Sequence, residues 1–268
     1  MKLKSLLKNK LVLIVLAYYL VVLLWWFKIF TSGVQTGTEN YLFNQAYVFF
    51  HIVGGISGLV IAHKKWGGFN SLVGKGISFL SLGLLAQGFG QTIWTYYNFF
   101  QDVEVPYPSL ADIGYFGLIP LYIYAMYNFA KSSGINVSLK TLSGKLQAVI
   151  IPVIMLVVAY ALFLKDLPVD LSQPLKTFFD WATPAFDAIS VSIGILTYSL
   201  SKSILGGKMK FKILYLVFAL VFEYITEYVF LYRAGLDLYY NAGPVDLMFA
   251  TSAMIMTVGI LQFNSIKE

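Results

Sequence analysis

The run LVLIVLAYYLVVLLWWF, residues 11–27, decides the fold class because it contains no charged residue and no helix-breaking residue. A helix that spans the hydrocarbon core of a bilayer needs about 20 predominantly apolar residues. Seven further apolar runs follow, separated by short polar segments. The sequence therefore predicts an all-α, polytopic membrane protein with eight transmembrane helices, roughly at residues 11–30, 44–63, 75–98, 109–130, 146–164, 177–203, 211–231 and 244–263.

The composition supports the same fold class. The chain has 268 residues, of which 58% are hydrophobic and 12% are charged, with a mean hydropathy of +0.73. Soluble domains carry about 25% charged residues. Eight spans use about 160 residues, which leaves about a dozen residues for each connection. We therefore expect no kinase, cyclase, nucleotide-binding or DNA-binding domain outside the bilayer.

The basic residues indicate the orientation. Of the 19 lysines and arginines, 15 fall on one side of the predicted spans, and the exceptions are Lys28, Lys165, Lys176 and Arg233. Cytoplasmic loops carry such an excess, so both termini are expected in the cytoplasm of a multi-pass protein of the cell membrane. The net charge of +6 is then a topology signal. We expect membrane lipid as a partner and no nucleic acid.

An internal duplication is suggested by an offset of 134 residues. Asp112 maps onto Asp246, Ser109 onto Gly243 and Thr92 onto Thr226 without a gap. Residues 1–134 and 135–268 would each hold four spans and form one integral membrane domain. Both copies would cross the membrane in the same direction, which is a parallel repeat.

Six acidic residues lie inside or at the mouths of the predicted spans, toward the outer half. Ionisable groups within spans are costly and are functional candidates by default. For two of them a structural role is the main alternative, because Asp112 and Asp246 occupy the third position of a helix after Ser109 and Gly243-Pro244. A carboxylate there caps the helix and meets its positive end. The six are Asp112, Asp180, Asp187, Glu223, Glu227 and Asp246.

The deeper acids point more strongly to a binding site. Glu223 and Glu227 are four residues apart and share a helix face, where like charges repel. In a medium of low dielectric constant, one of them should hold a proton or both should share a cation. Asp180 and Asp187 also share a face, on a helix that contains Pro184. His51, Gln87 and Gln91 are expected at similar depths, from two further spans.

Two interpretations of these polar groups remain open. One is an outward-facing cavity, lined by acidic and aromatic residues, that binds a proton, a cation or a small ligand. The other is a set of interhelical hydrogen bonds that hold the bundle together. With two histidines, no cysteine and no lysine deep inside a span, we expect no metal, haem or retinal, and therefore no cofactor. No residue is assigned a catalytic role.

The stretch YPSLADIGYFGLIPL, residues 107–121, resembles a pattern found in multi-pass membrane sensor regions of prokaryotes. Those regions precede diguanylate cyclase, phosphodiesterase or histidine kinase domains. The matching residues include Pro108, Ser109, Ala111 and Asp112. This sequence continues to Glu268 with no output domain, so the resemblance implies a sensor module that signals through a partner protein.

Three functions are compatible with this pattern. The first is a membrane sensor or binding module, which we favour. The second is a proton- or cation-coupled transporter of a small solute. The third is an intramembrane enzyme acting on a lipid or isoprenoid substrate, with Asp187 and Glu223 as an acid–base pair.

Overall fold

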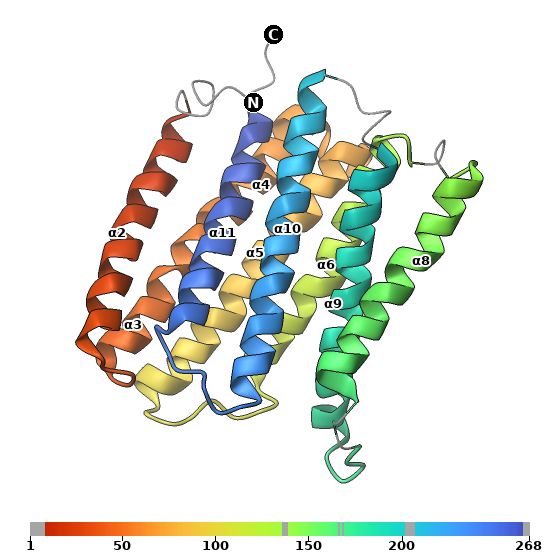
Figure 1. Cartoon of the computed structure of the whole chain (residues 1–268). Helices are drawn as coiled ribbons and strands as arrows, with labels where there is room; N and C mark the ends of the chain where they lie inside the picture. The colour runs from red at the N-terminus through yellow and green to blue at the C-terminus, as the bar shows by residue number, and fades with distance from the viewer. Residues whose placement is uncertain (1–8, 136–138, 166, 168, 202–206, 265–268) are drawn as a thin grey trace.

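The computed structural model describes residues 9–135, 139–165, 167, 169–201 and 207–264, and this part of the chain contains helices and no strand (Figure 1). The predicted all-α fold class is therefore confirmed. The α-helices are α2 Lys10–Ser32, α3 Thr38–Ala46, α4 Val48–Trp66, α5 Leu72–Thr95, α6 Leu110–Ser132, α8 Leu142–Ala159, α9 Pro174–Ser201, α10 Gly207–Ala234 and α11 Pro244–Leu261. Turns of π-helix, Tyr96–Phe100 and Tyr160–Leu164, extend α5 and α8.

Seven segments of the described chain are long and apolar enough to cross a membrane. They contain α2, α3 with α4, α5, α6, α8, α10 and α11. The remaining long helix, α9, is not among them and carries Lys176, Asp180 and Asp187. The second predicted span is not one continuous helix. Helix α4 begins after Tyr47, and the residues before Tyr47 form the separate helix α3.

Local signals in the sequence explain where several helices begin and end. Asn9 and Ser71 accept a hydrogen bond from the first turn of α2 and α5, which satisfies an otherwise unpaired amide. Gly33 ends α2 with a φ of 72°. Glycine adopts this left-handed conformation without the steric cost of a Cβ.

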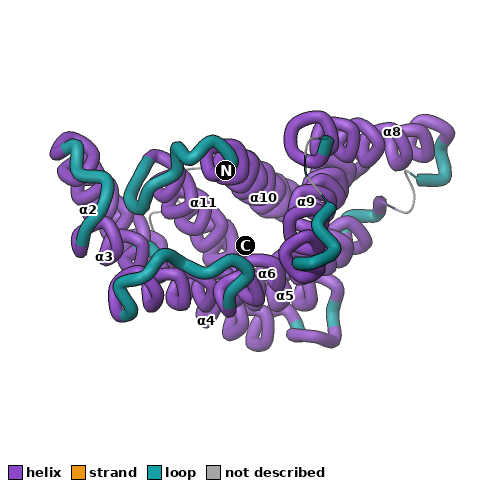
Figure 2. The backbone as a smooth tube through the Cα atoms, turned by 90° about the horizontal axis from the view of Figure 1, so that it is seen from below, coloured by secondary structure: helices purple, strands orange, loops and turns teal. Residues whose placement is uncertain are grey.

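Six helices form a closed ring. Each of α4, α5, α6, α9, α10 and α11 packs against the next, and α11 packs against α4. Figure 2 shows α4, α5 and α6 along one side of the ring and α9, α10 and α11 along the other. Helix α2 packs on α11, and α8 packs on α9, outside the ring. The ring therefore separates an interior from the surroundings.

The outer helices expose large apolar side chains. Helix α8 exposes residues such as Val149, Val153 and Val157, and α2 exposes Leu20 and Leu24. Soluble monomers rarely expose large apolar patches. Seven apolar helices and these two flanks agree with a protein that sits in a bilayer.

Two ends of the bundle can be defined from its helices. The acid-rich end is where α6 and α11 begin, at Asp112 and Asp246, and the lysine-rich end is where α4 ends, at Lys64 and Lys65. Helix α2 begins and α11 ends at the lysine-rich end, which is uppermost in Figure 1.

Glycines permit the close packing inside the ring. A Cβ on Gly114 of α6 would meet the backbone of Ala86 and Gly90 in α5. Gly54 and Gly58 of α4 face side chains of α5 and α11 in the same way. The four-residue spacing of Gly54 and Gly58 therefore lets α4 approach α5 and α11 closely.

We predict that Gly114→Ala destabilises the protein by about 1–3 kcal/mol, the usual cost of overpacking. The neighbouring atoms belong to the backbone and cannot rotate away. Gly117→Ala, on the same helix, is the matched control because a Cβ there meets open space. Unfolding midpoints in detergent should fall for Gly114→Ala and stay level or rise for Gly117→Ala. Equal midpoints for the two variants would contradict this packing.

Candidate cation- and ligand-binding site

Asp112 caps helix α6. Its side chain accepts a hydrogen bond from the backbone N–H of Ser109 at 2.5 Å, and the Ser109 hydroxyl accepts from the N–H of Ala111 at 3.1 Å. This is the capping box that the spacing predicted. The two residues at the centre of the sensor-like stretch therefore have a structural role at the acid-rich end.

Asp246 also lies at the start of its helix, but it accepts from different donors than expected. Its Oδ2 receives the backbone N–H of Ala242 at 2.6 Å, and Tyr239 donates its hydroxyl to Oδ1 at 3.2 Å. Burial and the nearby Asp246 raise the pKa of the Tyr239 hydroxyl well above its usual range. Tyr239 therefore remains a donor, and Asp246 fastens the loop before α11 to the bundle.

This loop is bonded to α3 and α5 at the acid-rich end. Asn241 Oδ1 accepts from Asn44 Nδ2 at 2.6 Å and from Trp94 Nε1 at 2.9 Å, and the Asn241 carbonyl accepts from Asn40 Nδ2 at 2.9 Å. Trp94 of α5 donates to this loop because residues 235–243 fold back over the end of α5.

Asp180 and Gln91 are not part of the deep acidic group. Asp180 accepts from the Tyr107 hydroxyl at 2.7 Å and forms an ion pair with Lys176 at 3.0 Å. Gln91 is buried and accepts from the hydroxyl of Tyr115 at 2.9 Å. Asp180 therefore has a cationic partner, and Gln91 has a neutral donor.

The structure joins Glu223 of α10 to α5. The Gln87 amide donates a hydrogen bond to Glu223 Oε1, and both side chains are buried. His51 of α4 lies beside Gln87 and is fully buried, with its Nδ1 at 3.2 Å from the carbonyl of Tyr47. Ser252 of α11 lies beside Glu223. Four helices of the ring thus contribute to one polar cluster.

Asp187 and Glu227 extend this cluster toward α9. Asp187 is 1% exposed, Glu223 is 2% exposed and Glu227 is half-buried. Asp187 lies within electrostatic range of Glu223, and Glu227 lies within that range of both. At 1.5 Å per residue, Glu223 lies about 24 Å from the start of α10 and Asp187 about 20 Å from the start of α9. Asp187 and Glu223 therefore lie near the middle of the bundle, and Glu227 lies about one helical turn closer to the acid-rich end.

No lysine or arginine of the described chain forms an ion pair with these three carboxyls. Several buried polar atoms around them lack a hydrogen bond of good geometry. Such atoms are uncommon in native proteins and need an explanation, such as a bound ion or water. They are His51 Nε2, Gln87 Oε1, Asp187 Oδ2, Ser190 Oγ, Tyr224 OH, Tyr228 OH and Ser252 Oγ.

Four of the residues in this cluster were not predicted from the sequence. Ser190 follows Asp187 by three residues, and Tyr224 and Tyr228 each follow a glutamate directly. Helical spacing could have placed Ser190 on the face of Asp187. The approach of Ser252 to Glu223 depends on the packing of α11 against α10, which no local pattern encodes.

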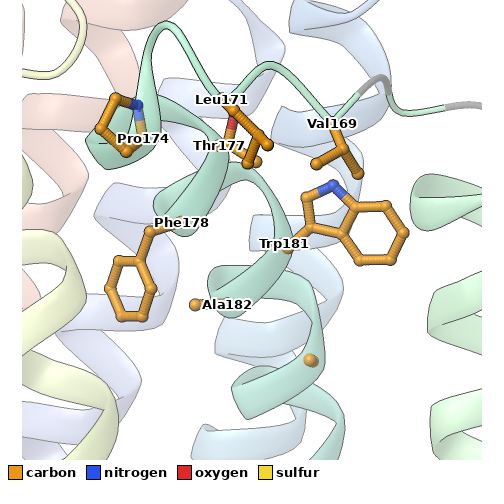
Figure 3. A pocket seen from close by; sticks show the side chains of 8 residues that line it. Val169, Leu171, Pro174, Thr177, Phe178, Trp181 and Ala182 are labelled. Atoms are coloured by element: carbon orange, nitrogen blue, oxygen red, sulfur yellow. The ribbon is translucent and has the colours of Figure 1, made fainter.

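A pocket of about 580 Å³ lies elsewhere, beside the first turns of α9 (Figure 3). Val169, Leu171, Phe178 and Trp181 are among its lining residues, and none of the predicted site residues lines it. The pocket is almost wholly apolar. It therefore does not correspond to the acidic cavity expected from the sequence.

The donor set of the cluster bears on the kind of ion it could hold. Within the described residues, no group of three or more histidines, cysteines, aspartates and glutamates is arranged to hold a metal ion. The available ligands are single carboxyls and hydroxyls. Comparison of the chain with family models, curated proteins and solved structures gives no match, so function is argued from the site itself.

We predict that Gln87→Met destabilises the protein by about 1.5–3 kcal/mol, because Glu223 loses a buried donor to a charged group. In a Glu223→Leu background the same substitution should cost much less, since neither polar group is then left without its partner. Gln101→Met, at an exposed position, is the control. Equal costs of Gln87→Met in both backgrounds, measured by unfolding in detergent, would contradict the Gln87–Glu223 interaction.

Proposed function

We propose that this chain is a multi-pass membrane sensor, a binding module whose acidic and aromatic interior takes a cation or a small cationic ligand from the outer face. The observation that carries the proposal is the group of Asp187, Glu223 and Glu227 inside the ring, with no described cationic side chain paired to them.

Electrostatics supports a positively charged occupant. An isolated charge is expensive to bury, and like charges in one site disfavour ionisation of both. A bound cation offsets this cost and a proton reduces it. The hydroxyls of the buried Tyr122 and Tyr224 lie within electrostatic range of Glu223. Aromatic side chains and carboxylates in one interior suit an organic ammonium ion as well as an inorganic cation.

The proposal includes α9 as an eighth transmembrane helix. Helix α9 has 28 residues and packs between α6 and α10 in the ring. Asp187 of α9 then faces the protein interior, which is where ionisable residues of spans are found. With the lysine-rich end in the cytoplasm, both termini are cytoplasmic and the protein belongs to the cell membrane.

The order of helices in the ring supports a 4+4 parallel repeat. An exchange of the halves maps α4, α5 and α6 onto α9, α10 and α11. Every neighbouring pair in the ring then maps onto another neighbouring pair. Helix α2, the partner of α8 under this exchange, likewise lies outside the ring.

Resemblance of residues 107–121 to prokaryotic membrane sensor regions supports signalling as the purpose of binding. The chain would then pass its state to a signalling partner protein in the membrane. Ser109 and Asp112, which belong to the sensor-like pattern, form the cap of α6. Their structural role is to fix the end of a helix of the ring.

The binding proposal is tested with detergent-purified protein and three probes, NaCl, KCl and tetramethylammonium chloride. At 100 times its Kd, a ligand stabilises the folded state by about 2.7 kcal/mol, which corresponds to a rise of about 5–10 °C in the unfolding midpoint. At least one probe should produce this rise. Glu223→Gln and Asp187→Asn should abolish it, and Asp180→Asn should retain it.

The proposal fails if none of the three probes raises the midpoint. It also fails if the rise persists in both Glu223→Gln and Asp187→Asn. Ionic strength is held constant with N-methylglucamine chloride, so that screening of surface charges does not imitate binding.

Cation-coupled transport is the second candidate, and Pro184 on α9 favours it. Proline within a transmembrane helix frees a backbone carbonyl, and backbone carbonyls at a midplane site coordinate the coupling ions of transporters. Pro184 lies three residues before Asp187. Solute flux in proteoliposomes that depends on Asp187 and Glu223 would favour transport, whereas binding without flux would favour a sensor.

A further inference from the structure

We propose that Asp187 and Ser190 of α9, with Tyr224 and Tyr228 of α10, form a binding site for a small monovalent inorganic cation, for which Na⁺ is the probe. This inference rests on the proposed function and assigns the cation to particular ligands. Three of the four residues were not among the candidates predicted from the sequence.

The backbone brings these side chains together on two faces. Asp187 and Ser190 are three residues apart and share one face of α9, and Tyr224 and Tyr228 are four apart and share one face of α10. The two helices are neighbours in the ring. The Tyr224 hydroxyl lies beside Ser190, and both tyrosines lie within electrostatic range of Asp187.

Each residue contributes an oxygen atom without a well-aligned hydrogen bond, although the hydroxyls of Ser190 and Tyr224 lie close enough to interact with each other. These atoms are Asp187 Oδ2, Ser190 Oγ and the hydroxyls of Tyr224 and Tyr228. Asp187, Ser190 and Tyr224 are at most 1% exposed. Several such oxygens around one carboxyl are an unusual concentration, because nearly all buried polar groups in native structures are paired.

The chemistry of these oxygens selects a hard cation. Carboxylate and hydroxyl oxygens suit alkali and alkaline-earth ions, whereas transition metals favour nitrogen and sulfur ligands. Asp187 is the one carboxylate among the four proposed ligands, and Glu223 already receives a hydrogen bond from Gln87. A single positive charge therefore matches the ligand set, and a water molecule would satisfy its hydrogen bonds without balancing the charge of Asp187.

The site also explains the polar character of α9. This helix is the long helix that is not apolar enough to count among the seven candidate spans. Asp187 and Ser190 lie on the inner face of α9, where α10 packs against it, and both are buried. Their role as cation ligands would account for polar residues in this helix. Binding between α9 and α10 would stabilise the contact between these two helices.

Ser192 offers a matched control for Ser190. It lies on the same helix and is equally buried, but its hydroxyl already donates to the carbonyl of Ala188 at 2.6 Å. Removal of the Ser192 hydroxyl therefore leaves the proposed ligands untouched. Asp180→Asn is the corresponding control for Asp187→Asn, because Asp180 is paired with Lys176.

The experiment is a titration of the unfolding midpoint with NaCl at constant ionic strength in N-methylglucamine chloride. We expect Na⁺ to raise the midpoint by about 5–10 °C at saturation. Asp187→Asn should abolish the response. Ser190→Ala and Tyr224→Phe should each weaken the apparent Na⁺ affinity about 10-fold, as expected for loss of one ligand worth about 1.4 kcal/mol. Ser192→Ala and Asp180→Asn should keep the wild-type affinity.

Circular dichroism and cooperative unfolding verify that each variant is folded. The proposal is overturned if Na⁺ has no effect on the wild-type protein. It is equally overturned if Asp187→Asn still responds, or if Ser190→Ala and Ser192→Ala respond alike. Stabilisation by tetramethylammonium that needs Glu223, without any effect of Na⁺, would overturn this site and leave the proposed function standing. A wild-type protein that responds to no cation would overturn both.

Discussion

Burial of carboxyl groups inside a closed ring of helices is the constraint on which the rest of the structure depends. Asp187 and Glu223 are almost fully buried between helices that belong to that ring. A bilayer outside the ring offers no water, so the charge must be balanced within it. Part of this balance comes from the hydrogen bond that the Gln87 amide donates to Glu223, with His51 and Ser252 nearby.

The two halves of the chain contribute unequally to this interior. At the offset of 134 residues, Asp187, Glu223 and Glu227 correspond to Val53, Phe89 and Ile93, none of which is acidic. The first half supplies His51 and Gln87, whereas the second half supplies the three acids and the neutral residues Ser190, Tyr224, Tyr228 and Ser252. The order of helices in the ring is symmetric under exchange of the two halves, whereas the site is not.

Much of the fold was predictable because membrane helices leave a strong local signal. Uninterrupted apolar runs located the long helices. The spacing of Ser109 and Asp112 predicted a capping box, which the structure contains. The predicted backbone donor to Asp246, at the cap residue Gly243, was wrong by one residue. The turn before α11 presents the amide of Ala242 instead. The separation of α3 from α4 at Tyr47 has no proline or glycine to mark it.

The site was less predictable than the fold. Acidic residues inside apolar runs are conspicuous, so Asp187 and Glu223 were found from the sequence. Asp180 has similar surroundings in the sequence, yet it pairs with Lys176 at the acid-rich end. Ser190, Tyr224 and Ser252 are ordinary residues of their helices and gain importance only when α9, α10 and α11 pack together. Local periodicity does not encode which helices become neighbours.

The central claim is that Asp187 and Glu223 act on one another inside a single interior site. A double-mutant cycle of Asp187→Asn and Glu223→Gln tests it most directly, with unfolding free energies measured in N-methylglucamine chloride. Because removal of either charge relieves the other, the account predicts a coupling energy of at least about 1 kcal/mol between the two substitutions. Effects that add within about 0.3–0.5 kcal/mol would show independent sites and contradict the account.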